Sequence, residues 1–179
     1  MRNDEGSNRG FYEGVIQNPL YYSRTGNTRH AAKLLEEKLK ERNRDVKLVE
    51  IEAVKKPGFF KAGFAAFRQK ELPMKNTEFD LKEFDAILVG CPIWAGRPAP
   101  FVKTFFNKAM NGKGKKVGLF VTGGGASGSQ TKAADVMKQY AQTHGFIPVE
   151  TFLALQMTPG KIKDGTQIID QFLTTVLSK

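Results

Sequence analysis

Residues 21–28 read Tyr-Tyr-Ser-Arg-Thr-Gly-Asn-Thr (YYSRTGNT) and place three small hydroxyl side chains around one glycine. Apolar residues then recur at helical spacing from Ala31 to Leu39, so we expect a helix that begins at Asn27. Serine or threonine before a helix often serves only as a cap. A glycine-containing turn before a helix can instead hold phosphate, because the first N–H groups of the helix have no partner within it. The stretch therefore indicates either a helix cap or a cradle for an anion.

Short apolar runs and helical patterns alternate along the rest of the chain. We expect strands at residues 46–51, 85–90, 115–122 and 146–155, with a first strand before Ser23. Further helices are expected at Pro98–Ala109, Gln130–Thr143 and Thr166–Leu177. Alternating strands and helices form parallel sheets through right-handed crossovers. The sequence therefore predicts an α/β fold, a doubly wound open sheet with helices on both faces.

Ligands bind such sheets beyond the carboxyl ends of the strands, which directs attention to three loops. Loop one is residues 23–28, loop two is residues 91–97, and loop three is residues 122–129. Loop two holds the chain's one tryptophan, Trp94, which either stacks on a planar ligand or packs under the loop. In loop three, residues 123–128 match the dinucleotide pattern G-x-G-x-x-G, but only one strand follows, so that function is not expected.

Taken together, "SRTGNT", "GCPIWAGRPAPFVKTFF" and "TGGGASG" resemble the flavodoxin family over roughly residues 20–179. The resemblance implies a five-stranded parallel sheet in the order 2-1-3-4-5 and non-covalently bound FMN. It also implies which residues contact the cofactor. The phosphate would be bound by Ser23, Thr25, Gly26, Asn27 and Thr28, with Arg24 supplying charge or pointing to solvent. The flavin ring would be bound by Pro92, Ile93, Trp94, Ala95 and Gly96 of loop two and by Thr122, Gly123 and Gly124 of loop three. On this basis we interpret YYSRTGNT as an anion cradle.

The first strand departs from the family pattern, because it contains Gln17, Asn18 and Pro19 where a buried central strand is expected. Proline has no N–H to donate to a strand ladder. The strand either starts late, near Leu20, or has an irregular upstream half. We therefore assign residues 1–18 to an N-terminal tail and residues 19–179 to the FMN-binding domain.

The net charge of +10 is a second departure, since flavodoxins are typically acidic. It favours a solvated basic surface, and we expect no specific nucleic-acid partner. The segment at residues 55–70 is both basic and aromatic, with Phe60, Phe64 and Phe67 at helical spacing. These residues either form a second helix that covers the sheet or contact a partner or a membrane surface.

The sequence predicts an FMN-binding electron-transfer protein whose partner is a redox protein or a small electron acceptor. One alternative is an NAD(P)H-dependent FMN quinone reductase of the same fold, and another is a basic binding module that has lost flavin. No side chain is expected to be catalytic, and His30 and His144 predict no metal cluster. The single cysteine, Cys91, excludes an internal disulfide and indicates a cytoplasmic protein. No apolar run approaches the roughly 20 residues that a membrane span needs.

Overall fold

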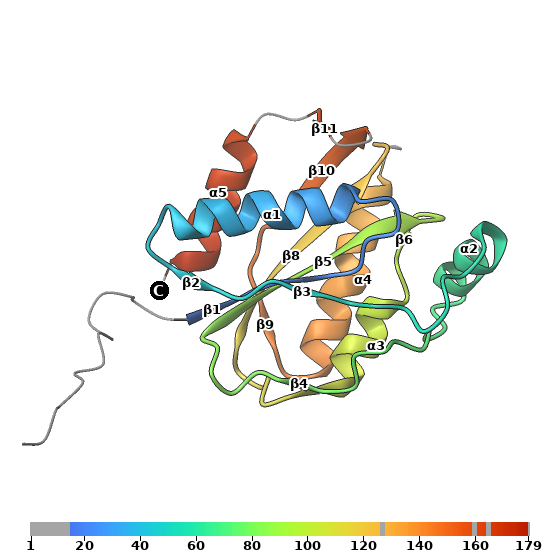
Figure 1. The fold of residues 1–179 in the computed structure, drawn as a ribbon, viewed down its shortest axis with the longest axis horizontal. Coiled ribbons are helices and arrows are strands. Elements are labelled where there is room, and N and C mark those ends of the chain that lie inside the picture. Colours follow the sequence, from blue (N-terminus) through green and yellow to red (C-terminus); the bar gives the residue numbers. More distant parts are fainter. Residues whose placement is uncertain (1–14, 126–127, 159–160, 164–165, 179) are drawn as a thin grey trace, which may run out of the picture.

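The computed structural model describes residues 15–125, 128–158, 161–163 and 166–178, in which strands and helices alternate (Figure 1). The five helices of this part are α1 (Asn27–Lys40), α2 (Phe59–Phe67), α3 (Phe101–Lys108), α4 (Ser129–Thr143) and α5 (Gln167–Leu177). The long strands are β1 (Val15–Tyr21), β5 (Ala86–Trp94), β8 (Lys116–Gly123) and β10 (Leu153–Thr158). The two-residue strands are β2 (Asp45–Val46), β3 (Val49–Glu50), β4 (Phe79–Asp80), β6 (Arg97–Pro98), β7 (Ala109–Met110), β9 (Ile147–Pro148) and β11 (Lys161–Ile162).

The main sheet confirms the predicted fold class and strand order. Its strands follow the order β11-β10-β8-β5-β1-β2, with β3 also paired to β1 and β9 to β8. All pairs among β1, β2, β3, β5, β8, β9 and β10 are parallel. The strand expected at 46–51 is divided into β2 and β3, and the strand expected at 146–155 is divided into β9 and β10. Counting each divided strand once gives the order 2-1-3-4-5.

β1 pairs with β5 through a register shift that accommodates its proline. Gln17 lies opposite Ile87 and Pro19 lies opposite Leu88, so Asn18 is the extra residue of a bulge. Bulges are among the positions in a sheet where proline is tolerated. The strand therefore starts at Val15 with an irregular upstream half, and the alternative start near Leu20 is wrong. The boundary drawn after residue 18 lies inside β1, and residues 1–14 of the expected tail lie outside the described residues.

Each face of the sheet carries its own apolar cluster (Figure 1). Helices α3 and α4 pack on one face against alternating strand residues such as Val89 and Leu119. Helices α1 and α5 pack on the other face against Leu88 and Phe120. Gly90 is needed at this packing, because a Cβ there would stand 2.0 Å from the Phe120 ring.

Helices α1 and α5 are also joined by an ion pair on the face that they share. Arg42 follows the end of α1, and its Nη2 lies 2.8 Å from Oδ1 of Asp170 in α5. The two residues are 128 positions apart in the chain. The face is therefore assembled from an early and a late segment of the sequence.

Helix α2 lies beside the ends of β5 and β6 and not over a face of the sheet (Figure 1). Its buried residues are the small ones, Ala62, Ala65 and Ala66. Its phenylalanines point to solvent. The expectation that these aromatic residues form a helix covering the sheet is therefore wrong, although the helix itself is present. Within the described part of the chain, none of the helices has the length and apolar character needed to cross a membrane.

Candidate functional site

Loop one follows β1, whereas loops two and three begin within the last residues of β5 and β8; the three strands are neighbours in the sheet and end at the same edge. Two hydrogen bonds tie the loops together at this edge. The Tyr22 N–H donates to the Gly90 carbonyl at 3.2 Å, just beyond β1. The hydroxyls of Thr28 and Thr122 lie 2.8 Å apart and share a hydrogen bond. The fold therefore brings together the three segments that the sequence analysis selected.

Loop one forms a tight turn at the amino end of α1. Gly26 has φ 94°, a left-handed conformation that favours glycine, and its N–H donates to Ser23 Oγ at 3.1 Å. The space where a Gly26 Cβ would stand is open, with no atom within 4 Å. No side chain caps α1, so the hydroxyls of loop one do not act as the helix cap that one interpretation expected. The positive end of the helix dipole faces this turn.

Thr28 and Thr122 contact each other through their hydroxyls. Both side chains are almost fully buried, and their hydroxyls bind each other across 94 positions of sequence. Thr28 was expected to bind phosphate and Thr122 to contact the flavin ring. In the structure their hydroxyls link loop one to loop three, while Thr25 is the exposed hydroxyl of loop one.

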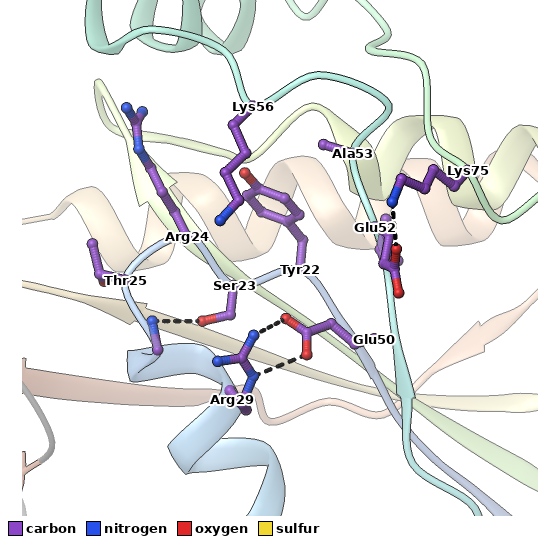
Figure 2. A pocket seen from close by; sticks show the side chains of 12 residues that line it. Tyr22, Ser23, Arg24, Thr25, Arg29, Glu50, Glu52, Ala53, Lys56 and Lys75 are labelled. Carbon is purple, nitrogen blue, oxygen red and sulfur yellow. Dashed lines mark hydrogen bonds and ion pairs between the residues drawn. The ribbon is translucent and has the colours of Figure 1, made fainter.

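A cavity of about 480 Å³ lies between loop one and the end of β3 (Figure 2). We call it the cation-lined pocket, and its lining residues are Tyr22, Ser23, Arg24, Thr25, Gly26, Arg29, Glu50, Ile51, Glu52, Ala53, Lys56 and Lys75. Four of these side chains are cationic and two are carboxylates, which leaves an excess of two positive charges. Such a pocket fits an anionic group.

One wall of the cation-lined pocket is fixed by Glu50. Arg29 donates to both oxygens of this carboxylate, from Nε at 2.9 Å and from Nη2 at 2.7 Å, and the contact raises the pKa of Arg29. The Tyr21 hydroxyl donates to Glu50 Oε2 at 3.1 Å. Burial, and secondarily the Glu50 charge, raise the pKa of Tyr21 to about 12. Two residues further along the same segment, Glu52 pairs with Lys75 at 3.0 Å (Figure 2). Arg24 and Lys56 lack such a carboxylate partner among the ion pairs of the described residues.

The Tyr22 hydroxyl is the one buried side-chain polar atom of the described residues that has no hydrogen-bond partner. Tyr22 is 3% exposed and lines the cation-lined pocket. Burial raises its pKa, so the hydroxyl stays protonated at neutral pH and can donate. An unpaired buried hydroxyl costs about 1–3 kcal/mol. A ligand that accepts from Tyr22 would recover that cost.

A second cavity, also of about 480 Å³, lies between loops two and three. We call it the loop pocket, and it is lined by Ile93, Ala95, Gly96, Gly123, Gly124, Gly125 and Ser129. No titratable side chain lines it, and the Cβ positions of Gly96 and Gly124 are open. Exposed backbone beside the apolar Ile93 suits a planar ring. Ala126 and Ser127, which complete the glycine-rich pattern of loop three, lie outside the described residues.

Trp94 packs inward and does not line the loop pocket. Its ring meets Tyr22 edge-on, with centroids 5.5 Å apart, and lies 6.4 Å from Phe101. The Arg24 guanidinium lies 5.8 Å from the Trp94 ring and 3.9 Å from the Phe59 ring of α2. A small cavity of about 240 Å³ separates α2 from loop two at this point. Trp94 therefore packs against the core with part of its surface lining this cavity, and its stacking on a planar ligand stays a prediction.

The remaining candidate residues, Pro92 and Asn27, belong to the backbone framework around the loops. The Pro92 carbonyl accepts from the Ala99 N–H at 3.1 Å, and Pro92 pairs with Thr122 in the sheet. Asn27 is the first residue of α1. Of the fourteen candidates, Ser23, Arg24, Thr25 and Gly26 line the cation-lined pocket, and Ile93, Ala95, Gly96, Gly123 and Gly124 line the loop pocket.

Sequence reasoning missed the contribution of the segment after β3. Glu50 and Glu52 lie at or beyond the end of a predicted strand, so the rule that selected the other loops also applied to this one. Tyr22 and Arg29 flank loop one, and no sequence pattern indicated that they would line a pocket. No sequence pattern indicated that Phe59 would reach Arg24.

Comparison with known proteins gives a consistent picture. A model of the family described as NADPH-dependent FMN reductase matches residues 21–159. The Minor allergen Alt a 7 of Alternaria alternata is 31% identical over 139 residues, which cover 73% of this chain and 67% of the allergen.

Several crystal structures share the fold at low sequence identity. A provisionally named flavoprotein of Bacteroides eggerthii is 21% identical, with a TM-score of 0.69 over 93% of this chain and 100% of its own. A flavoprotein of Lactobacillus acidophilus in complex with FMN is also 21% identical, with a TM-score of 0.61 over 89% and 99%. Flavodoxin 2 of Bacillus cereus is 20% identical, with a TM-score of 0.58 over 91% and 95%.

Proposed function

Because the chain belongs to the NADPH-dependent FMN reductase family, we propose that it is an FMN-dependent oxidoreductase that takes electrons from a reduced nicotinamide nucleotide. The acceptor is a small molecule of the quinone class. FMN is the cofactor, and the flavodoxin-like family expected from the sequence is confirmed. The observation that carries the proposed activity is the presence of two large pockets, one between loops two and three with exposed backbone, and one beside loop one that is lined by cations.

The residues present fit FMN. Thr25 and the amino end of α1 would hold the phosphate, since the turn at Gly26 is open and α1 has no side-chain cap. The loop pocket would hold the ring against Ile93 and the backbone of loops two and three. When bound, FMN supplies the uptake and release of one or two electrons. The chain's own residues bind and orient, and the Thr28–Thr122 bond keeps both halves of the site in register.

The cation-lined pocket supports a direct nicotinamide donor. A nicotinamide dinucleotide carries a pyrophosphate, and Arg24 and Lys56 offer positive charge that is not neutralised by any ion pair within the described part of the chain. Arg29 is bound to Glu50, so it forms part of the pocket wall and its charge is already paired. Tyr22 adds a buried donor. These features favour an enzyme over the electron-carrier function that the sequence analysis put first.

A steady-state assay tests the proposal. FMN-saturated protein is expected to oxidise NADPH when a benzoquinone is present, with electrons recovered in the quinol. Lys56→Gln should raise the KM for NADPH several-fold and leave FMN affinity unchanged. The matched control is Lys82→Gln, at the opposite edge of the sheet before β5, which should change neither value.

The negative outcomes separate the alternatives. Protein that binds FMN but oxidises no NADPH would be an electron carrier with a redox partner protein. Protein that takes up no FMN would be a basic binding module. We also infer a cytoplasmic location, because the one cysteine of the chain is free and buried.

A further inference from the structure

Helix α2 exposes nearly all of its large apolar side chains. Phe59, Phe60, Phe64 and Phe67 are 76%, 96%, 55% and 65% exposed, while the helix buries alanines. Burying a phenylalanine side chain stabilises a folded protein, because its apolar surface is removed from water. A helix that turns its alanines inward and its phenylalanines outward forgoes this gain at four positions. Exposed apolar patches of this kind mark interaction surfaces.

The charges around these rings have one sign. Residues 53–70 contain five cations, Lys55, Lys56, Lys61, Arg68 and Lys70, and no aspartate or glutamate. Two of the cations stand over the aromatic surface, Arg68 at 5.6 Å and Lys70 at 5.9 Å from the Phe64 ring. We call the four phenylalanines and five cations the α2 face; one of these cations, Lys56, also lines the cation-lined pocket.

The composition and shape of the α2 face indicate which kind of partner can bind it. A second copy of the chain would bring five cations against five, which is repulsive. A folded acidic protein would need to wrap a short helix that stands out from the body (Figure 1). A lipid surface deforms around such a helix, takes aromatic rings at the boundary of headgroups and acyl chains, and supplies negative charge. We propose that the α2 face docks this protein on an anionic membrane surface.

Docking through α2 would bring the candidate site to the membrane. Phe59 contacts Arg24, Arg24 contacts Trp94, and a small cavity lies between α2 and loop two. The loop pocket shares Ile93 and Ala95 with this cavity. An acceptor dissolved in the bilayer would then reach the flavin ring without crossing much water. This step rests on the proposed function, whereas the docking itself does not.

Vesicle co-sedimentation of the full chain tests the docking without any measure of activity. We expect binding to vesicles of equal parts phosphatidylcholine and phosphatidylserine, weak binding to phosphatidylcholine alone, and release by salt. Each cation near the surface contributes about fivefold in affinity, so Lys61→Gln with Lys70→Gln should lose about 25-fold. Phe60→Ser with Phe67→Ser should lose at least about tenfold, since both rings contribute apolar area.

The control pair is Lys82→Gln with Lys108→Gln, which removes the same charge from the opposite edge of the sheet and should bind as the wild type does. All the replaced side chains are exposed, so thermal unfolding should be unchanged. Absence of wild-type binding to the anionic vesicles, or loss of binding in the control pair equal to that in the α2 pair, overturns the proposal. Loss in the lysine variant but not in the phenylalanine variant would mean that charge alone binds the vesicles, and it overturns docking through the aromatic rings. A wild-type dimer that the phenylalanine variant dissociates assigns it to self-association.

Discussion

The buried bond between the Thr28 and Thr122 hydroxyls predicts a strong coupling in a double-mutant cycle. The single variants are Thr28→Val and Thr122→Val, because valine keeps the shape of threonine and removes the hydroxyl. In either single variant the partner hydroxyl stays buried with nothing to bind, which costs about 1–3 kcal/mol of unfolding free energy. At about 2–4 °C per kcal/mol for a chain of this size, the melting temperature should fall by about 2–12 °C.

The double variant should be closer to the wild type than the sum of the singles, because removing both hydroxyls leaves no orphan. We expect a coupling free energy of about 1 kcal/mol or more between the two positions. Urea unfolding of the four proteins, with equal m-values, measures it. Thr131→Val, at an exposed position of α4, is the control and should stay within about 0.5 kcal/mol of the wild type.

Additive losses, with a coupling below about 0.3–0.5 kcal/mol, would refute the reasoning, because they would mean that the two hydroxyls act independently. A flavin titration adds a second readout. Each single variant should weaken FMN binding, since the bond holds loop one against loop three. Unchanged FMN affinity in both single variants would show that the Thr28–Thr122 hydrogen bond does not contribute to FMN binding.

Four further predictions concern single residues. Thr25→Ala should weaken FMN by about 1.5–3 kcal/mol and leave riboflavin unaffected, because in the proposed site the exposed hydroxyl binds the phosphate; equal losses in calorimetric titrations would place the phosphate elsewhere. Between pH 10 and about 12 the folded protein keeps the Tyr21 proton, held by burial and a neighbouring carboxylate, while the unfolded chain releases it. The unfolding free energy should therefore fall across that range, and less steeply in Tyr21→Phe; identical slopes in urea unfolding would count against this. Gly90→Ala should cost at least about 1–3 kcal/mol because the new methyl meets the Phe120 ring. Gly63→Ala, in an open helical position, should stabilise by about 0.5–1 kcal/mol in the same unfolding experiment.

Periodicity was sufficient to predict the α/β class and four of the five helices within about three residues of their observed ends, whereas the strand order was implied by the resemblance to the flavodoxin family. It could not predict the bulge at Asn18, because a register shift depends on which β5 residue each β1 residue meets. Periodicity also predicted the position of α2, but the side of this helix that was expected to be buried is the exposed one. A pattern identifies the apolar side of a helix, but tertiary packing decides which side is buried, and here the smaller alanines fit against loop two.

The candidate site was predicted at the level of loops and only partly at the level of atoms. Glycines such as Gly26 and Gly96 follow from turn chemistry, which is local. The pairing of Thr28 with Thr122 is set by the closeness of β1 and β8 in space, and no local signal contains it. The same holds for Tyr22, whose hydroxyl is buried by residues far along the chain.

The ribosome makes α1 long before it makes the helix that packs beside it. Arg42 and Asp170 are 128 residues apart, and at about 5–20 residues per second this separation takes about 6–26 seconds to synthesise. Throughout that interval the side of α1 that α5 later covers has no partner, and the cluster containing Leu35, Leu39 and Phe172 cannot close. A nascent chain of this protein is therefore most open to aggregation and to chaperone capture on this one face, just before α5 emerges.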